Sequence, residues 1–339
     1  MPKFYLGLDL GGTNVKAGVV DEHGAMVAQT SVPTGTSPAD LSAQRVIARM
    51  VEAGSQAIAK SGIARRDMAA VGVLSPGQAS LERGIVFRSA NLPLWRNVAL
   101  RKKVSQGLGL RAVLENDANA AAYGEWWAGA GGGAKPLSNL FMFTLGTGVG
   151  GGLVYEGKVV RGSYDFGTEV GHWVMIPGGE LCGCGQRGCL ERYCSAKYTA
   201  QRANLRLAKS RKLRLSSSLG AIYEKAGEVT SADIVVQAKA GDVFALEIWD
   251  QTCRMLALAC INVCHFIDPQ MIVLAGGMSQ AGRFLLDAVN RHFKAEWWKM
   301  TRITTRIALA RLGNDAGVIG AAGVAKEAEE RGVLPGVGE

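Results

Sequence analysis

Two stretches of the sequence share one layout, and this repeat constrains the fold more than any other feature. Residues 4–24, FYLGLDLGGTNVKAGVVDEHG, run from an apolar segment through a glycine turn into a second apolar segment and another turn. Residues 141–157, FMFTLGTGVGGGLVYEG, repeat this order about 135 residues further on. Each stretch is typical of a β-hairpin. The repeat therefore predicts two related α/β domains, each opening with a hairpin and a glycine turn.

Further strands and helices are expected after each hairpin. Short apolar runs predict buried strands at 69–74, 111–115 and 270–277. Apolar residues at helical spacing predict helices at 37–62, at about 243–265 and from about 315. Ser37 is the expected N-cap of the first helix, with Pro38 in its first position. We expect an α/β protein with a small domain of residues 1–117 plus a C-terminal helix at about 322–339, and a large domain of residues 118–321.

Composition and charge narrow the classes of function. The apolar share of 48% and the charged share of 20% are ordinary for a soluble globular protein. The net charge is +9, but the densest basic run, residues 202–214, has no aromatic side chains between its charges. A solvated helix is therefore favoured over a nucleic-acid site. The chain starts without a signal-peptide pattern and has no apolar run long enough to cross a bilayer, so we expect a cytoplasmic protein with reduced cysteines.

Four of the seven cysteines fall within residues 182–194, and three of them are spaced as metal ligands. Cys182, Cys184 and Cys189 are separated by glycines that let the loop wrap tightly, and His172 lies ten residues upstream. Three thiolates and one imidazole make a closed tetrahedral set, which suits structural Zn²⁺. Cys194 is expected to be a bystander. The remaining cysteines are expected to be buried thiols on one helix face: Cys253, Cys260 and Cys264.

The two glycine turns are candidate phosphate sites. The first, D-L-G-G-T-N at 9–14, offers free backbone N–H groups, and Asp9 could hold Mg²⁺ beside nucleotide phosphates. The second, G-T-G at 146–148, offers a similar nest. Neither turn matches a Walker loop or a dinucleotide-binding loop. Each turn taken alone is also compatible with an ordinary hairpin turn.

Acidic residues in three places are candidates for chemistry on hydroxyl groups. Asp117, in E-N-D-A-N, falls where a predicted strand meets a predicted helix, so it is either an N-cap or a catalytic base. Glu169 and Glu191 are close in sequence to the metal-ligand candidates, and a metal there would hold both carboxylates in place. Carboxylates pair well with vicinal hydroxyls, although exposed surface glutamates are the alternative for each.

Taken together, the motifs resemble those of the ROK family of sugar kinases and repressors. The matching strings run in the family's order and cover nearly the whole chain: D-L-G-G-T-N-V-K (9–16), S-P-G (75–77), N-D-A-N (116–119), L-G-T-G-V-G-G-G (145–152), E-V-G-H (169–172), C-G-C-G-Q-R-G-C-L-E (182–191) and A-G-G (275–277). The resemblance implies an actin-like, ribonuclease H-like fold of two α/β domains around a cleft. It also implies a homodimer.

The resemblance further implies ATP-dependent transfer of a phosphoryl group to the C6 hydroxyl of a hexose, with glucose as the first choice. Asp117 would be the catalytic base. The implied sugar partners are Gly77, Asn91, Asn116, Asp117, Glu169, His172 and Glu191. The implied nucleotide and phosphate partners are Asp9, Gly11, Gly12, Thr13, Asn14, Thr147, Gly148, Gly276 and Gly277. Mg²⁺ would bridge the phosphates, and the zinc would be structural.

Several alternatives stay open at this point. N-acetylhexosamine, mannose and fructose kinases of the family share nearly the same residues, and polyphosphate is an alternative donor. A sugar-responsive transcriptional regulator of the family is disfavoured, because the first glycine turn begins within ten residues of Met1 and leaves no room for a helix-turn-helix. A zinc-ribbon nucleic-acid binder would leave the glycine turns and N-D-A-N unexplained.

Overall fold

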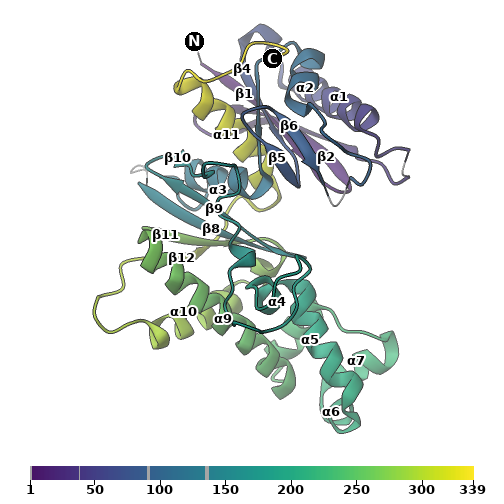
Figure 1. The fold of residues 1–339 in the computed structure, drawn as a ribbon, viewed down its shortest axis with the longest axis vertical. Helices are drawn as coiled ribbons and strands as arrows, with labels where there is room; N and C mark the ends of the chain where they lie inside the picture. Colours follow the sequence, from purple (N-terminus) through teal and green to yellow (C-terminus); the bar gives the residue numbers. More distant parts are fainter. Residues whose placement is uncertain (1, 38, 90–91, 134–136) are drawn as a thin grey trace. The chain divides into compact units, whose positions relative to one another are not determined.

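The computed structural model describes residues 2–37, 39–89, 92–133 and 137–339, which form two compact units (Figure 1). The first unit consists of Met1–Leu140, Gly152–Thr168 and Arg311–Glu339. The second consists of Phe141–Gly151 and Glu169–Ala310. The chain thus passes between the units more than once, which local sequence patterns do not reveal.

The first unit is built on a five-stranded sheet in the order β3-β2-β1-β4-β7. Its strands are β1 (Phe4–Leu10), β2 (Asn14–Asp21), β3 (Met26–Pro33), β4 (Met68–Leu74) and β7 (Ala112–Glu115). β1 and β2 form the predicted hairpin, while β4 and β7 run parallel to β1. A separate two-stranded sheet joins β5 (Gln78–Ser80) and β6 (Ile85–Arg88).

Helices cover both faces of this sheet. They are α1 (Ala43–Ser61), α2 (Leu100–Leu108), α3 (Asp117–Trp127) and α11 (Ala316–Glu330). Alternate residues of a strand point to opposite faces: Leu6 and Leu8 of β1 pack with α1, whereas Tyr5 packs with α11. The predicted cap of the first helix was wrong. Ser42, not Ser37, precedes α1, and Pro38 lies outside the described residues.

Glycines bring α11 unusually close to its neighbours. A Cβ on Gly72 of β4 would lie 1.8 Å from the carbonyl oxygen of Ala321 in α11. A Cβ on Gly320 of α11 would lie 1.9 Å from the carbonyl oxygen of Ala120 in α3. Because these neighbours are backbone atoms, only a residue without a Cβ fits at either position. The close packing fixes α3 and α11 against the sheet.

The second five-stranded sheet repeats the order of the first, as β10-β9-β8-β11-β12. Its strands are β8 (Asn139–Leu145), β9 (Val149–Tyr155), β10 (Lys158–Val159), β11 (Met271–Ala275) and β12 (Arg306–Leu309). In both sheets the first strand of a hairpin occupies the centre, the second lies on one side, and later parallel strands lie on the other. The prediction of two related hairpin-led sheets is therefore confirmed.

The helices of the second unit follow its glycine turn and its metal-ligand candidates. They are α4 (Glu191–Cys194), α5 (Ala196–Lys209), α6 (Arg211–Ser216), α7 (Ser218–Ala226), α8 (Ser231–Lys239), α9 (Val243–Ile267) and α10 (Arg283–Glu296). α9 packs against α10, and its cysteines at 253, 260 and 264 are buried as predicted. Among the helices of the described residues, none combines the length and apolarity that a membrane span requires.

Candidate active site

Asp117 stands at the start of α3, directly after β7. The cap of this helix is Asn116, whose Oδ1 accepts hydrogen bonds from the backbone N–H groups of Ala118 (2.9 Å) and Asn119 (3.2 Å). Asp117 itself is the first helical residue, and its solvent-accessible carboxylate accepts one local bond from Ala118 N. Since the neighbouring Asn116 satisfies the capping role, the N-cap interpretation of Asp117 is wrong.

Asp9 lies at the same carboxyl edge of the first sheet. In the parallel strands, Asp9 is in register with Leu74, and Leu74 with Glu115, two residues before Asp117. Desolvation raises the pKa of Asp9, and the negative charge of Asp117 raises it further, while Lys16 opposes the shift. Two carboxylates whose charges interact at the carboxyl ends of parallel strands are suited to a divalent cation and an ionic substrate.

The first glycine turn is held open beside Asp9. The turn closes through Gly11 N–H donating to Asn14 O (3.0 Å), and Thr34 supports it by donating its hydroxyl to Gly11 O (2.8 Å). Gly12 and Thr13 are exposed, and a Cβ on Gly12 would meet no atom within 4 Å. The backbone of this turn is therefore accessible to a ligand, as a phosphate site requires.

The second glycine turn is held by residues that follow the cysteine cluster. Gly146 N–H donates to Gly148 O (3.0 Å), and the first residue of α5, Ala196, donates its N–H to Gly146 O (2.8 Å). Oε2 of Glu191 accepts the backbone N–H of Val149 (3.1 Å). Glu191 was predicted to contact a sugar hydroxyl, but sequence reasoning missed this bond to the turn.

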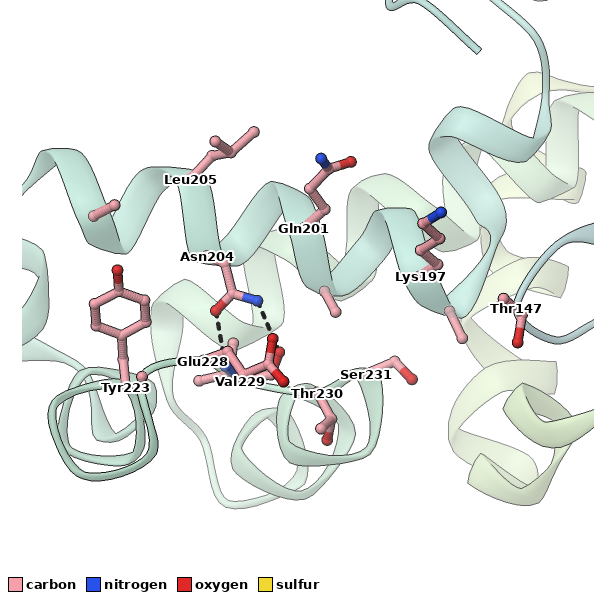
Figure 2. Close-up of a pocket in the computed structure, with 14 residues that line it drawn as sticks. Thr147, Lys197, Gln201, Asn204, Leu205, Tyr223, Glu228, Val229, Thr230 and Ser231 are labelled. Carbon is pink, nitrogen blue, oxygen red and sulfur yellow. Dashed lines mark hydrogen bonds between the residues drawn. The ribbon is translucent and has the colours of Figure 1, made fainter. Parts of the chain in front are cut away.

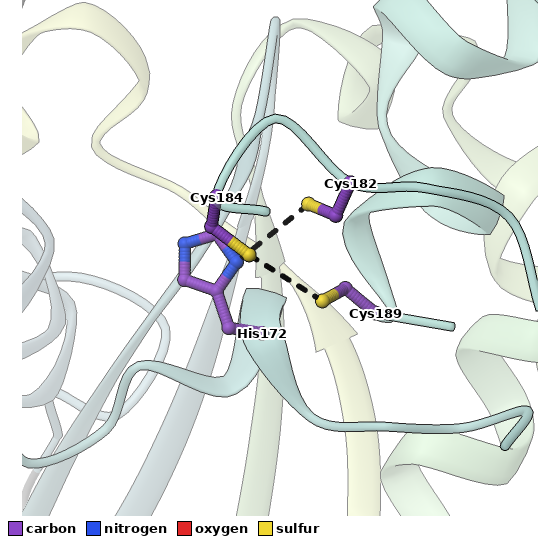
Figure 3. A group of neighbouring side chains, drawn as sticks. All are labelled: His172, Cys182, Cys184 and Cys189. Atoms are coloured by element: carbon purple, nitrogen blue, oxygen red, sulfur yellow. Dashed lines mark hydrogen bonds between the residues drawn. The ribbon is translucent and has the colours of Figure 1, made fainter. Parts of the chain in front are cut away.

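The four predicted metal ligands converge in the second unit (Figure 3). The ligand atoms of His172, Cys182, Cys184 and Cys189 all lie within 4.8 Å of one another. Cys184 Sγ is 3.7 Å from Cys189 Sγ, and Cys182 Sγ is 3.9 Å from His172 Nδ1. A tetrahedral zinc with Zn–S bonds of about 2.3 Å needs sulfurs about 3.8 Å apart. The cluster therefore has the donors and the spacing for Zn²⁺.

The other predicted sugar partners divide between the units. Gly77, Asn116 and Asp117 belong to the first unit; Glu169, His172 and Glu191 belong to the second. Gly77 has a φ of 101° and lies against the backbone of Arg88, so its position requires glycine. Glu169 is exposed. Asn91 lies outside the described residues.

A pocket of about 640 Å³ extends from the second glycine turn along α5 (Figure 2). Thr147 lies at one end, Lys197, Gln201 and Asn204 line the helix side, and residues 227–231 form the opposite wall. Asn204 holds that wall by bonding to both backbone groups of Val229, at 2.9 and 2.8 Å. Apart from Thr147, sequence reasoning missed these residues, because no local motif marks a wall that a distant side chain holds in place.

Gly276 and Gly277 directly follow β11, the neighbour of β8 in the second sheet. Gly276 has a φ of 87°, and a Cβ there would lie 2.5 Å from the carbonyl oxygen of Leu145, one residue before the second glycine turn. These two predicted nucleotide partners therefore lie next to the second glycine turn within the second unit.

Two sheets of one strand order, each with a glycine turn after its central strand, define the actin-like class of ATPase folds. The model of the ROK family matches residues 5–328. The glucokinase of Halalkalibacterium halodurans is 34% identical to this chain, and the match covers 96% of each of the two chains. The glucokinase of Thermotoga maritima is 36% identical, and the match covers 96% of this chain and 99% of that glucokinase. A ROK family glucokinase from Streptomyces griseus, solved with glucose and AMPPNP, is 31% identical with a TM-score of 0.75, covering 96% of this chain and 99% of that chain. The chain therefore belongs to the ROK family.

Proposed function

We propose that this protein is an ATP-dependent hexose kinase that phosphorylates the C6 hydroxyl of glucose. The observation that carries the proposal is the position of Asp117 at the carboxyl edge of the first sheet. Its carboxylate is not used as the helix cap, and its charge interacts with that of Asp9. The glucokinase relatives at 34–36% identity over nearly the full chain support the same activity. A cytoplasmic homodimer is part of this proposal on family resemblance.

Asp117 is the proposed general base. Its carboxylate accepts the proton of the C6 hydroxyl as that oxygen bonds to the γ-phosphorus, the bond from phosphorus to the β–γ bridging oxygen breaks, and ADP leaves. Asp9 is the residue that would hold Mg²⁺, which when bound neutralises phosphate charge. The exposed backbone at Gly11–Asn14 and the turn at Thr147 and Gly148 orient the phosphates through N–H groups.

For the donor we propose that the nucleoside occupies the pocket along α5, with Gly276 and Gly277 as further partners. Thr147 belongs to both the second glycine turn and the pocket lining, so a phosphate chain on the turn leads directly into the pocket. A volume of about 640 Å³ lies within the range of small-molecule sites. Polyphosphate, which has no base or ribose, would leave this pocket unused.

For the sugar we propose Gly77, Asn91, Asn116, Glu169, His172 and Glu191 as hydroxyl partners. Asn116 uses Oδ1 for the cap of α3, so its amide nitrogen is the group offered to a hydroxyl. Glu191 has Oε2 on the backbone N–H of Val149, and its Oε1, which lies 3.9 Å from Cys182 Sγ, is the acceptor that we propose for a hydroxyl. His172 turns Nδ1 toward Cys182, so Nε2 is the ring atom that would face the sugar.

The function is tested by ADP release in a coupled assay over a panel of hexoses, with ATP and polyphosphate as alternative donors. We expect the highest kcat/KM with glucose and ATP. Higher kcat/KM with mannose, fructose or an N-acetylhexosamine would reassign the substrate within the family. Absence of ADP release with every sugar would contradict the kinase proposal.

Replacing Cys184 by alanine should abolish zinc binding. The wild-type protein should carry about one zinc per chain after gel filtration with a weak chelator, because four donors saturate a structural zinc. Cys194→Ala is the matched control, since Cys194 lies close to the cluster in sequence but is not among its ligand atoms. Elemental analysis of both variants decides: equal zinc contents in the two would contradict the assignment.

On acidification the enzyme should lose activity at a higher pH than it would if its base had the pKa of an ordinary aspartate. Although the carboxylate of Asp117 is accessible to solvent, the protein atoms crowded around it partly desolvate it, and this raises its pKa against the lowering effect of local backbone N–H groups. A base works only when deprotonated, so activity is lost as pH falls through this raised pKa. The acid limb of kcat/KM for glucose, measured at constant ionic strength, should therefore inflect above the usual aspartate value of 3.8. An inflection at or below that value would contradict the shift.

A further inference from the structure

A chain of charged side chains runs through the first unit from β7 to α11. Arg161, which follows β10, donates from Nε to Glu115 Oε2 (2.6 Å) and from Nη2 to Glu327 Oε2 (3.1 Å). Glu115 and Glu327 are both buried, and Arg331 bonds the other oxygen of Glu327 at 3.1 Å. One guanidinium therefore bridges two buried carboxylates on two different elements.

Glu115 in turn holds the first turn of α3. Its Oε1 accepts the backbone N–H of Asn116 (2.9 Å) and the side-chain amide of Asn119 (3.2 Å). The amide oxygen of Asn119 accepts the hydroxyl of Thr168 (3.1 Å). These bonds flank Asp117 on both sides along the chain, so the Glu115 carboxylate supports the helix turn that Asn116 caps.

Burial of this kind makes Glu115 dependent on its cationic partner. Desolvation raises the pKa of Glu115, and the charge of Arg161 is the largest of the opposing effects. A buried carboxylate without its partner would take up a proton or turn toward water. Either change would disturb the pair of bonds that Oε1 makes to Asn116 and Asn119.

We propose that Arg161 is a positioning residue for phosphoryl transfer: through Glu115 it fixes the first turn of α3 and thereby the carboxylate of Asp117. The proposal rests on Asp117 being the base. Arg161 supplies two N–H groups in a planar fork, and its Nε and Nη2 reach carboxylates on β7 and α11 at once. A lysine ammonium is a single point of charge and cannot reproduce the fork.

Arg161→Lys is the main test, because it keeps the positive charge. We expect kcat, normalised to folded protein, to fall at least about tenfold, since small misplacement of a catalytic group is costly. KM for ATP should stay within about twofold, because the phosphate turns are untouched. A role in stability alone would lower the unfolding midpoint and leave kcat per folded molecule unchanged.

Glu327→Gln is the matched control. It removes the carboxylate charge that faces the same guanidinium on the α11 side, while Glu115 keeps its bonds to Asn116 and Asn119. Stability should therefore fall, and kcat should stay within about twofold of wild type. If Arg161→Lys does not fold, Glu115→Gln tests the same link, with the same expected loss of kcat.

The kinetic results distinguish a failure of this proposal from a failure of the base assignment. Loss of kcat in Asp117→Asn together with unchanged kcat in Arg161→Lys, or in Glu115→Gln where that variant replaces it, would overturn the positioning role alone. An Asp117→Asn variant of near-normal kcat would overturn the base assignment, and the role of Arg161 with it. Equal losses of kcat per folded molecule in Arg161→Lys and Glu327→Gln would show that the effect does not depend on the bond to Glu115, and would overturn the proposed link.

Discussion

Replacing Asp117 by asparagine should lower kcat about a thousandfold while glucose still binds with nearly unchanged affinity. The change is isosteric, so the first turn of α3 keeps its cap on Asn116 and its bonds to Glu115. What is lost is an acceptor for the proton of the attacking hydroxyl, because an amide oxygen is far less basic than a carboxylate. Turnover is measured by ADP release, and glucose affinity by calorimetry.

Asp67→Asn is the control for this experiment. Asp67 is an exposed aspartate of the first unit, placed before β4 at the opposite end of the strand from the site. It should leave both kcat and glucose affinity unchanged. A kcat for Asp117→Asn within tenfold of wild type would remove Asp117 from the role of base and require another acceptor for the proton.

Replacing Gly72 by alanine should destabilise the protein by at least about 3 kcal/mol. The added Cβ would lie 1.8 Å from the carbonyl oxygen of Ala321, and neither backbone can give way without separating α11 from the sheet. We expect a lower urea midpoint or failure to fold, because α11 also packs against α3 and β1. The measurement is urea unfolding followed by circular dichroism.

Gly133→Ala provides the comparison for Gly72. A Cβ at Gly133 would meet no atom within 4 Å, so the free energy of unfolding should change by less than about 0.5 kcal/mol. Equal unfolding midpoints for the two variants would show that α11 can shift away from β4 at little cost in stability. In that case the close approach of helix and strand would not limit stability.

The features that local sequence predicted well share one property: they depend on neighbours along the chain. The hairpins follow from apolar runs around glycine turns, and both sheets have them. The cluster of Cys182, Cys184 and Cys189 follows from ligand types and glycine spacing in one loop. Asp117 was singled out because a strand ends and a helix begins beside it.

Sequence patterns did not identify the helix cap where two residues close together in the sequence could both serve as one. Ser37 has the right residue type for a cap, but its hydroxyl bonds Asp40 at 2.6 Å and forms a turn before the helix. Similarly, Asp117 had two readings, and only the geometry of Asn116 decided between them. Propensity ranks such neighbours almost equally, so the choice depends on how the flanking segments are held.

Glu125 illustrates a role that no local pattern could have indicated. It lies in the apolar helix α3 and is fully buried. Its carboxylate accepts the backbone N–H groups of Ala130, Arg311 and Leu312, at 2.8 to 3.1 Å. A buried carboxylate must be satisfied by donors, and here two of them come from nearly 190 residues away. It thereby anchors the segment that leads into α11.

The sequence by itself determined the repeated α/β architecture, the metal-ligand loop, the two glycine turns and the position of Asp117. The tertiary structure alone decided which partners those residues have: the wall of the α5 pocket, the bond from Glu191 to the second turn, and the link from Arg161 through Glu115 to α3. Turns, hairpins and ligand spacing are set by short-range sterics and residue type. Buried polar partners are set by segments brought together only when the chain has folded, so their pairing leaves no periodicity to read.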